Sequence, residues 1–226
     1  MIVTPESIHF SSPKGFLVLD GVNGAGKTTL LKKIEAYLSF KGTNFTSTRE
    51  PGATPVGKEL RSILLEGKAG EVSPVAEILL FAGDRAEHVD KVIAPALAKK
   101  ELVLCDRYVY STLAFQGYGR ELSLEDIKTV NNIAARGYLP DFVILLDLSP
   151  EEGLKRTAKR DEVGGKDSFE AEELSFHTRL RNGFLKIADE AQEPFLKIDA
   201  SESPEQIFST VMPVIEKWRT SLASSH

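Results

Sequence analysis

Short apolar runs alternate with longer amphipathic stretches along this chain. The residues between the runs follow helical periodicity, and the runs themselves predict five strands, over 16–20, 44–49, 102–106, 142–147 and 195–199. Strands that alternate with helices favour a parallel sheet covered by helices on both faces. The pattern therefore predicts an α/β, doubly wound, five-stranded parallel sheet in one domain over 1–226, with 1–14 as an N-terminal extension that frays.

Helix starts are marked by a serine or threonine before a proline, a pairing typical of an N-cap followed by the first helical residue. These pairs are Thr54-Pro55, Ser73-Pro74, Ser149-Pro150 and Ser203-Pro204. The long helical pattern over 74–100 contains Pro95, where we expect a kink or break.

The sequence directly after the first predicted strand matches G-x-x-x-x-G-K-[ST], the phosphate-binding P-loop. Glycines let successive backbone N–H groups point at a phosphate, and the following helix adds its N-terminal dipole. Lys27 is expected to reach the β- and γ-phosphates of a nucleotide, and the Thr28 hydroxyl to hold Mg²⁺. The predicted nucleotide-binding residues are Gly21, Val22, Asn23, Gly24, Ala25, Gly26, Lys27, Thr28 and Thr29.

Composition narrows the class of protein. A formal net charge of −5 argues against a general nucleic-acid binder, so positive charge for a phosphate substrate must be local. The single cysteine, Cys105, lies in an apolar run and is expected to be a buried, inert thiol. There is no signal-peptide pattern and no apolar run near the roughly 20 residues that span a bilayer. These features favour a cytoplasmic protein without a membrane partner.

Two further strand ends carry groups suited to phosphate chemistry. Asp106 ends a strand and is a candidate Mg²⁺ ligand, directly or through water, with an N-cap as the alternative. Arg107 follows it, and Arg49 ends the second strand; the guanidinium fork matches phosphate oxygens. Glu50 is expected to orient Arg49, and Pro51 is a candidate for a cis bond or a rigid turn.

The segment 155–173 is polar and dense in charge. A solvated helix–loop–helix is one interpretation. Beside a P-loop, we favour a lid that closes over phosphates and excludes water. It offers Arg156 and Arg160 at i,i+4 on one helix face. An arginine there would stabilise charge on a transferring phosphoryl group, with Arg160 preferred and Arg156 second.

Four stretches together resemble the thymidylate kinase family over residues 15–218. They are F-x-x-x-D-G-x-x-G-x-G-K-T-T at 16–29, T-R-E-P-G at 48–52, L-L-F-x-x-x-R at 79–85 and D-R-Y-x-x-S-T-x-x-F-Q-G at 106–117. The resemblance implies phosphorylation of dTMP to dTDP with ATP and Mg²⁺ by in-line transfer, in a homodimer. It also implies that Lys27, Arg107 and a lid arginine neutralise the charge that develops.

The resemblance further implies how dTMP is held. Phe81 would stack on thymine and Arg85 would reach its O4 carbonyl. Arg49 and Arg107 would bind the phosphate. Thr112 and Gln116 would contact base and sugar, and Phe115 would disfavour a 2′-hydroxyl.

The chain departs from the family pattern at Asn23, which stands where an acid is usual, and at Ser168, which stands where many members have a lid arginine. It also has Asp20 where many members have Glu, and Ala53 where a second glycine is common. Gly24 stands where only some members have a P-loop arginine.

Two other functions are kept as alternatives. One is a deoxynucleoside kinase acting on thymidine, with Glu50 as its base. The other is a P-loop GTPase-like regulatory binder, although its Asn-Lys-x-Asp motif is missing.

Overall fold

The computed structural model describes the backbone at residues 2–10, 12–161 and 168–223. The side chains at 160, 161, 168 and 223 lie outside the described part as well. Arg160 and Ser168, which the lid hypothesis invokes, are therefore described only as backbone.

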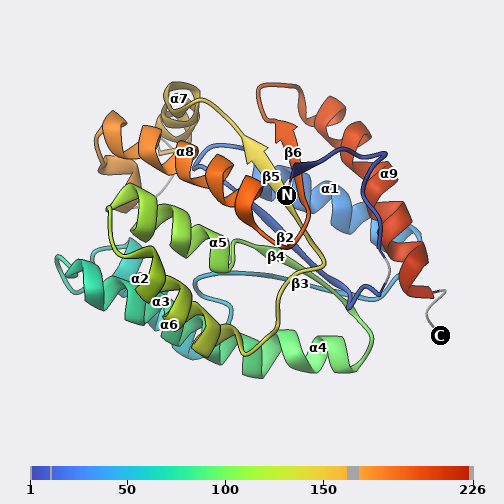
Figure 1. Ribbon diagram of the computed structural model, residues 1–226, viewed down its shortest axis with the longest axis horizontal. Coiled ribbons are helices and arrows are strands. Elements are labelled where there is room, and N and C mark those ends of the chain that lie inside the picture. Colours follow the sequence, from blue (N-terminus) through green and yellow to red (C-terminus); the bar gives the residue numbers. More distant parts are fainter. Residues whose placement is uncertain (1, 11, 162–167, 224–226) are drawn as a thin grey trace.

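A parallel sheet forms the centre of the molecule (Figure 1). Its strands lie in the order β1-β6-β5-β2-β4-β3. They are β1 (Ile2–Val3), β2 (Phe16–Gly21), β3 (Phe45–Arg49), β4 (Leu102–Asp106), β5 (Phe142–Asp147) and β6 (Phe195–Asp199). The predicted doubly wound parallel sheet is confirmed, with six strands in place of five.

The extra strand comes from the N-terminal extension. Ile2 and Val3 pair in parallel with Phe195 and Leu196 at the edge of the sheet. Ile8 is buried, and the ring of Phe10 lies 5.1 Å from that of Phe142. The expectation that this extension frays is wrong for its described residues, because apolar side chains anchor it to the core.

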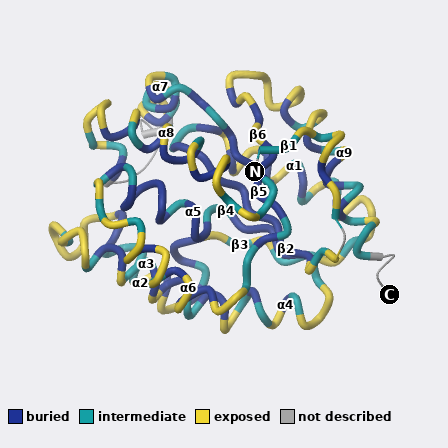
Figure 2. The backbone as a smooth tube through the Cα atoms, in the orientation of Figure 1, coloured by how far each residue is buried: buried dark blue, intermediate teal, exposed yellow. Residues whose placement is uncertain are grey.

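Helices cover both faces of the sheet, with α1 and α9 on one side and α5 and α8 on the other (Figure 1). Their bounds are α1 (Lys27–Phe40), α2 (Pro55–Leu65), α3 (Pro74–His88), α4 (Ala94–Ala98), α5 (Val109–Thr112), α6 (Leu124–Ala135), α7 (Pro150–Asp161), α8 (Leu174–Glu190) and α9 (Pro204–Ala223), with π-helical turns η1 (Val89–Ile93) and η2 (Leu113–Gly119) and a 3-10 turn η3 (Ser168–Ala171). The central strands β2, β4 and β5 and the inward helix faces are largely buried, while the outward helix faces are exposed (Figure 2).

The helix boundaries agree with the capping pattern. Thr54 Oγ1 accepts a 2.9 Å hydrogen bond from Gly57 N, and Ser149 and Ser203 cap α7 and α9 in the same way. Ser73 precedes α3 without such a bond from its side chain. The interruption expected near Pro95 takes the form of the π-helical turn η1, which lets the chain pass a residue that has no backbone N–H to donate.

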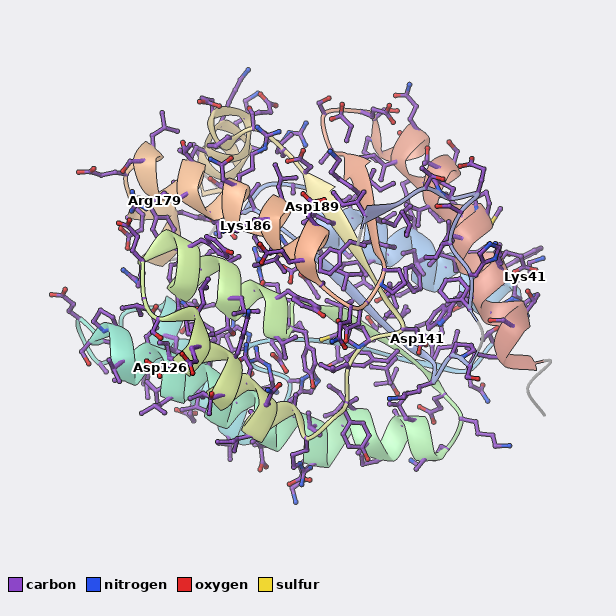
Figure 3. The ribbon with its side chains drawn as sticks, in the orientation of Figure 1. Lys41, Asp126, Asp141, Arg179, Lys186 and Asp189 are labelled. Atoms are coloured by element: carbon purple, nitrogen blue, oxygen red, sulfur yellow. The ribbon has the colours of Figure 1, made fainter. Side chains whose placement is uncertain are left out.

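Asp141 joins the amino end of β2 to the last helix (Figure 3). Its carboxylate accepts hydrogen bonds from the backbone N–H groups of Lys14, Gly15 and Phe16 and from Trp218 Nε1, at 2.7 to 3.0 Å. These bonds fix where β2 begins, and so where its other end delivers the P-loop. Across the described residues, we find no helix long and apolar enough to cross a membrane.

Candidate active site

A cavity of about 400 Å³ opens at the carboxyl ends of the central strands. Strand register brings this edge together, since Asp106 pairs with Leu19 on one side and with Arg49 on the other. The cavity collects most of the predicted site residues. Among those lining it are Asn23, Gly24, Gly26, Lys27, Thr28, Thr29, Arg49, Glu50, Phe81, Arg85, Asp106, Arg107, Thr112, Phe115, Gln116 and Arg156.

The loop between β2 and α1 has the backbone that a phosphate cradle requires. Gly21, Gly24 and Gly26 all have positive φ, which L side chains rarely adopt. Gly26 is the N-cap of α1, so the first N–H groups of that helix face the cavity edge. Lys27 is 7% exposed, and its Nζ donates to the carbonyls of Gly21 and Val22 at 3.1 and 2.9 Å. The ammonium is thereby held at the loop.

The P-loop touches α7 backbone to backbone. A Cβ placed on Gly24 would lie 2.4 Å from the carbonyl oxygen of Gly153, and one on Gly153 would lie 2.8 Å from the carbonyl oxygen of Asn23. Neither position has room for a side chain. The backbone of α7 therefore leaves no room for an arginine at position 24 of the P-loop.

Thr28 and Asp106 meet at the mouth of the loop. Thr28 Oγ1 lies 3.4 Å from Asp106 Oδ2, which it reaches as a donor. Asp106 Oδ1 is buried and has no hydrogen-bond partner among the described residues. A hydroxyl and a carboxylate with an unused buried oxygen are the hard oxygen donors that Mg²⁺ prefers, so these residues fit that ion.

Arg107 donates four hydrogen bonds, two of them to the P-loop at Gly21 and Asn23. Nη1 donates to Asp20 Oδ1, Gly21 O and Ser111 Oγ, and Nη2 donates to Asn23 Oδ1 at 2.6 Å. Its φ of 71° turns the chain sharply after β4 and directs the side chain back over β2. Burial raises the pKa of the Asp20 carboxyl, and the Arg107 charge offsets part of that shift.

The position where the family usually has an acid is occupied by an amide with two partners. Asn23 Oδ1 accepts from Arg107, and its Nδ2 donates to Glu170 Oε1 at 3.3 Å. Glu170 belongs to η3, beyond the described end of α7. Asn23 thus links the arginine after β4 to the far arm of the predicted lid segment.

Glu50 does not orient Arg49, as the sequence led us to expect. Its Oε2 accepts from Arg85, with Nε at 2.9 Å and Nη2 at 2.8 Å, and its Oε1 contacts His88 Nδ1 at 2.9 Å. All three side chains are buried. Arg49 lines the cavity with an exposed side chain, and the bond between Glu50 and Pro51 is cis, one of the two states predicted for it.

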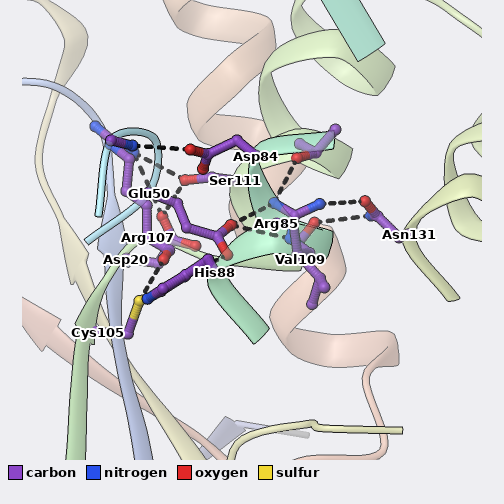
Figure 4. Close-up of polar contacts among 12 residues, drawn as sticks. Asp20, Glu50, Asp84, Arg85, His88, Cys105, Arg107, Val109, Ser111 and Asn131 are labelled. Carbon is purple, nitrogen blue, oxygen red and sulfur yellow. Dashed lines mark hydrogen bonds and ion pairs between the residues drawn. The ribbon is translucent and has the colours of Figure 1, made fainter. Parts of the chain in front are cut away.

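Arg85 is the centre of a buried polar network that also includes residues missed by sequence reasoning (Figure 4). Its Nη1 donates to Asn131 Oδ1 at 2.6 Å and its Nη2 to Thr112 Oγ1 at 3.0 Å. His88 continues the network to Thr48 through Nε2. The sequence could have indicated His88, because it follows Arg85 at i+3 and so shares its helix face. Nothing in the sequence indicated Asn131.

Aromatic side chains form the apolar wall of the cavity. Phe81 and Phe115 each pack against Phe169 of η3, with ring centroids 6.4 and 5.1 Å apart. Arg120 holds η3 against α3, because it forms ion pairs with Glu77 of α3 and with Glu172 just after η3. The far arm of the predicted lid segment is therefore packed against Phe81 and Phe115.

The two candidate lid arginines differ in what the structure describes. Arg156 lines the cavity, and its guanidinium is shared between Glu152 Oε1 at 3.1 Å and the carbonyl of Ala200 at 3.0 Å. The side chain of Arg160 lies outside the described part of the chain. The choice between them stays a prediction.

Fold and cavity together define the class. A strand, a glycine-rich phosphate loop and a helix carry Lys27 and Thr28 to the carboxyl edge of a doubly wound sheet. Arginines from two neighbouring strands face the same cavity, whose opposite wall is aromatic. This is a P-loop nucleotide-binding protein whose phosphate loop and aromatic wall share one cavity.

Comparison with known proteins identifies the family. The thymidylate kinase family model matches residues 19–211. The chain is 41% identical over 207 residues to a thymidylate kinase of Desulfovibrio desulfuricans, covering 90% of this chain and 95% of that protein. It is 44% identical over 201 residues to one from a Synechococcus strain, covering 89% and 95%.

A solved structure agrees with these sequence relatives. The crystal structure of thymidylate kinase from Ehrlichia chaffeensis matches with a TM-score of 0.71 and 28% identity, over 89% of this chain and 97% of that chain. The chain belongs to the thymidylate kinase family.

Proposed function

We propose that this protein transfers the γ-phosphate of ATP to dTMP and releases dTDP and ADP. The observation that carries the proposal is that one cavity joins the P-loop to the pocket walled by Phe81 and Arg85, with Arg107 between them. A donor phosphate on the loop and an acceptor phosphate at the arginines would then lie within one enclosed space. Family membership supports the same reaction.

Phosphoryl transfer to a monophosphate needs no strong general base, because the attacking phosphate oxygen is already ionised. The protein must align two phosphates and neutralise the charge that develops between them. Lys27 and Arg107 supply positive charge held by hydrogen bonds beside the P-loop, and Arg49 adds an exposed guanidinium at the cavity. Mg²⁺ held by Thr28, with Asp106 beside it, would add the divalent charge that such transfers need.

The opposite end of the cavity suits a pyrimidine deoxynucleotide. Phe81 offers an aromatic face for the base, and Thr112 and Gln116 are buried polar groups beside it. Phe115 packs against Phe169 and narrows the space expected for the sugar. Arg156 or Arg160 would approach the transferring phosphate when 155–173 closes, which would also exclude water.

A thymidine kinase is the competing function, and it needs a carboxylate base beside the acceptor hydroxyl. Glu50, the candidate for that role, has both oxygens engaged by Arg85 and His88. A carboxylate held between two such groups is a poor base. The geometry therefore favours the monophosphate as acceptor.

A coupled assay of ADP release tests the proposal. The protein, ATP and Mg²⁺ are incubated with dTMP, dUMP, thymidine, CMP or AMP. We expect turnover with dTMP well above the others. Turnover with thymidine in place of dTMP would overturn the proposal and make Glu50 the next residue to mutate.

We further propose a homodimer in the cytoplasm, as predicted from the family resemblance and composition. Val75 and Leu79 occupy i and i+4 on α3 and are 65% and 57% exposed. Two large apolar side chains on one helix face favour burial against a second copy. Light scattering on the purified protein gives the mass directly, and a monomer at all concentrations would reject this assembly.

A further inference from the structure

The guanidinium of Arg85 is held in its plane from three sides. Glu50 at the end of β3, Thr112 in α5 and Asn131 in α6 each accept a hydrogen bond from it. The residue is 1% exposed, yet it lines the cavity. An arginine so enclosed presents only a narrow edge to a ligand, and its partners decide which edge that is.

Asn131 differs from the other two partners in its position. It is 4% exposed and is absent from the residues that line the cavity, whereas Glu50 and Thr112 both line it. It contacts Arg85 from α6 (Figure 4). Any effect it has on a bound base must therefore act through Arg85.

The orientation of the Asn131 amide is itself fixed. Its Nδ2 donates to the carbonyl oxygen of Val109 at 3.1 Å, which leaves Oδ1 as the atom that faces Arg85. Nη1 of Arg85 carries two hydrogens, and Asn131 accepts one of them. Among the described residues, Nη1 has no other partner, so its second N–H remains for a ligand.

We propose that Asn131 is a positioning residue that aims the second Nη1 hydrogen of Arg85 at the 4-oxo group of a pyrimidine. The proposal rests on the function proposed above and on the role that the family resemblance implies for Arg85, which is to reach the O4 carbonyl of thymine. A donor that cannot turn away accepts a 4-oxo pyrimidine and is left unpaired by a 4-amino pyrimidine. Asn131 thereby contributes to the discrimination between dTMP and dCMP without touching either.

Three variants separate positioning from simple stability. Asn131→Leu removes the acceptor for Arg85 and also the bond to Val109. Asn131→Asp keeps an acceptor for Arg85 but loses the donor to Val109. Asn132→Leu changes the neighbouring, exposed asparagine of the same helix and serves as the control. For each, KM and kcat are measured with dTMP and with dCMP, together with Tm.

We expect Asn131→Leu to raise the KM for dTMP about tenfold, with kcat at saturating dTMP within about threefold of wild type. The ratio of kcat/KM for dTMP over dCMP should fall by about the same factor. Asn131→Asp should hold both quantities within about threefold of wild type although its Tm also falls. Asn132→Leu should match the wild type throughout.

Two results would overturn the proposal. The first is a lower Tm for Asn131→Leu with an unchanged dTMP to dCMP ratio, which is the signature of a structural role alone. The second comes from Arg85→Ala as a reference: an unchanged KM for dTMP would remove base reading by Arg85, and this proposal with it. A raised KM in Arg85→Ala with none in Asn131→Leu would reject the positioning role and keep the proposed function.

Discussion

Nη2 of Arg107 and Oδ1 of Asn23 lie 2.6 Å apart, so the arginine that follows β4 is fastened to the middle of the P-loop. The same amide donates to Glu170. One side chain, in a position where the family usually has an acid, therefore connects Arg107, which we propose binds phosphate, with the predicted lid segment.

Removing this amide should impair use of dTMP more than use of ATP. We expect Asn23→Ala to lower kcat/KM for dTMP about tenfold, because a hydrogen bond to a charged group contributes about 1.5–3 kcal/mol. Steady-state kinetics with each substrate varied in turn provide the measurement. Asn23→Asp keeps the acceptor for Arg107 and should retain more activity than the alanine variant; equal losses would argue against the Arg107 contact as the cause.

Lys27→Ala should abolish nearly all turnover. The ammonium is held at the loop by the carbonyls of Gly21 and Val22, where it would face the transferred phosphate. A loss of at least about a hundredfold in kcat is expected, as for other removed charge-stabilising donors. Tm should change little. If kcat stays within tenfold of wild type, this loop is not where the transferred phosphate is held.

Phe81→Ala should act mainly on the binding of dTMP. A base stacked on an aromatic ring gains about 1–3 kcal/mol, so the Kd for dTMP should rise by about five- to a hundredfold. Isothermal titration calorimetry with dTMP alone measures it. Ile133→Ala, which truncates an apolar side chain that is 72% exposed on α6, is the control and should bind normally. An unaltered Kd in the Phe81 variant would contradict stacking.

Asp84 should make stability depend on pH. Burial, with the nearby Glu50 charge, raises its pKa from 3.8 to about 6. A carboxyl whose folded-state pKa is raised favours folding in its protonated form. That contribution is complete below about pH 4 and is lost as pH rises through about 6.

Asp84→Asn tests this sign. The amide stays neutral and its oxygen can still accept from Gly52 N, as Asp84 does at 3.0 Å. Above pH 7 the variant should be more stable than wild type, by up to about 3 kcal/mol for a shift of two units. The difference should shrink toward pH 4. Urea denaturation at several pH values measures it, and a variant less stable at pH 8 would reverse the sign.

Gly24→Ala should destabilise the protein more than Gly26→Ala. Both positions have positive φ, so both substitutions carry backbone strain. Only at position 24 would the new Cβ also meet a carbonyl, that of Gly153, while nothing lies within 4 Å at position 26. An additional cost of about 1–3 kcal/mol is expected for Gly24→Ala. Equal unfolding free energies for the two variants would show that α7 moves away from the new Cβ at little cost.

Much of this molecule follows from local sequence signals. The P-loop, the strand ends at Asp106 and Arg49 and the cap at Thr54 depend on neighbours within a few residues, and the sequence reveals such neighbours. The pairing of Glu50 with Arg85 spans 35 residues, and that of Arg85 with Asn131 spans 46. Such contacts depend on how α3 and α6 pack together, which periodicity cannot supply.

The added strand β1 was missed for a related reason. Ile2 and Val3 form too short an apolar run to predict a strand. They form one because they can pair with the open edge of β6. Glu50 was expected to orient Arg49 because the two residues are adjacent in the sequence, but adjacent residues need not contact each other. Arg49 is exposed at the cavity, whereas Glu50 is buried against Arg85 and His88.

The seating of Gly24 on Gly153 has an evolutionary consequence. In this chain, an arginine at 24 cannot be introduced alone, because its Cβ would enter the backbone of α7, the helix that leads to the lid. To replace a lid arginine by one in the P-loop, α7 would first have to move away from position 24. A single substitution at this position would therefore disrupt the fold before it could supply the charge.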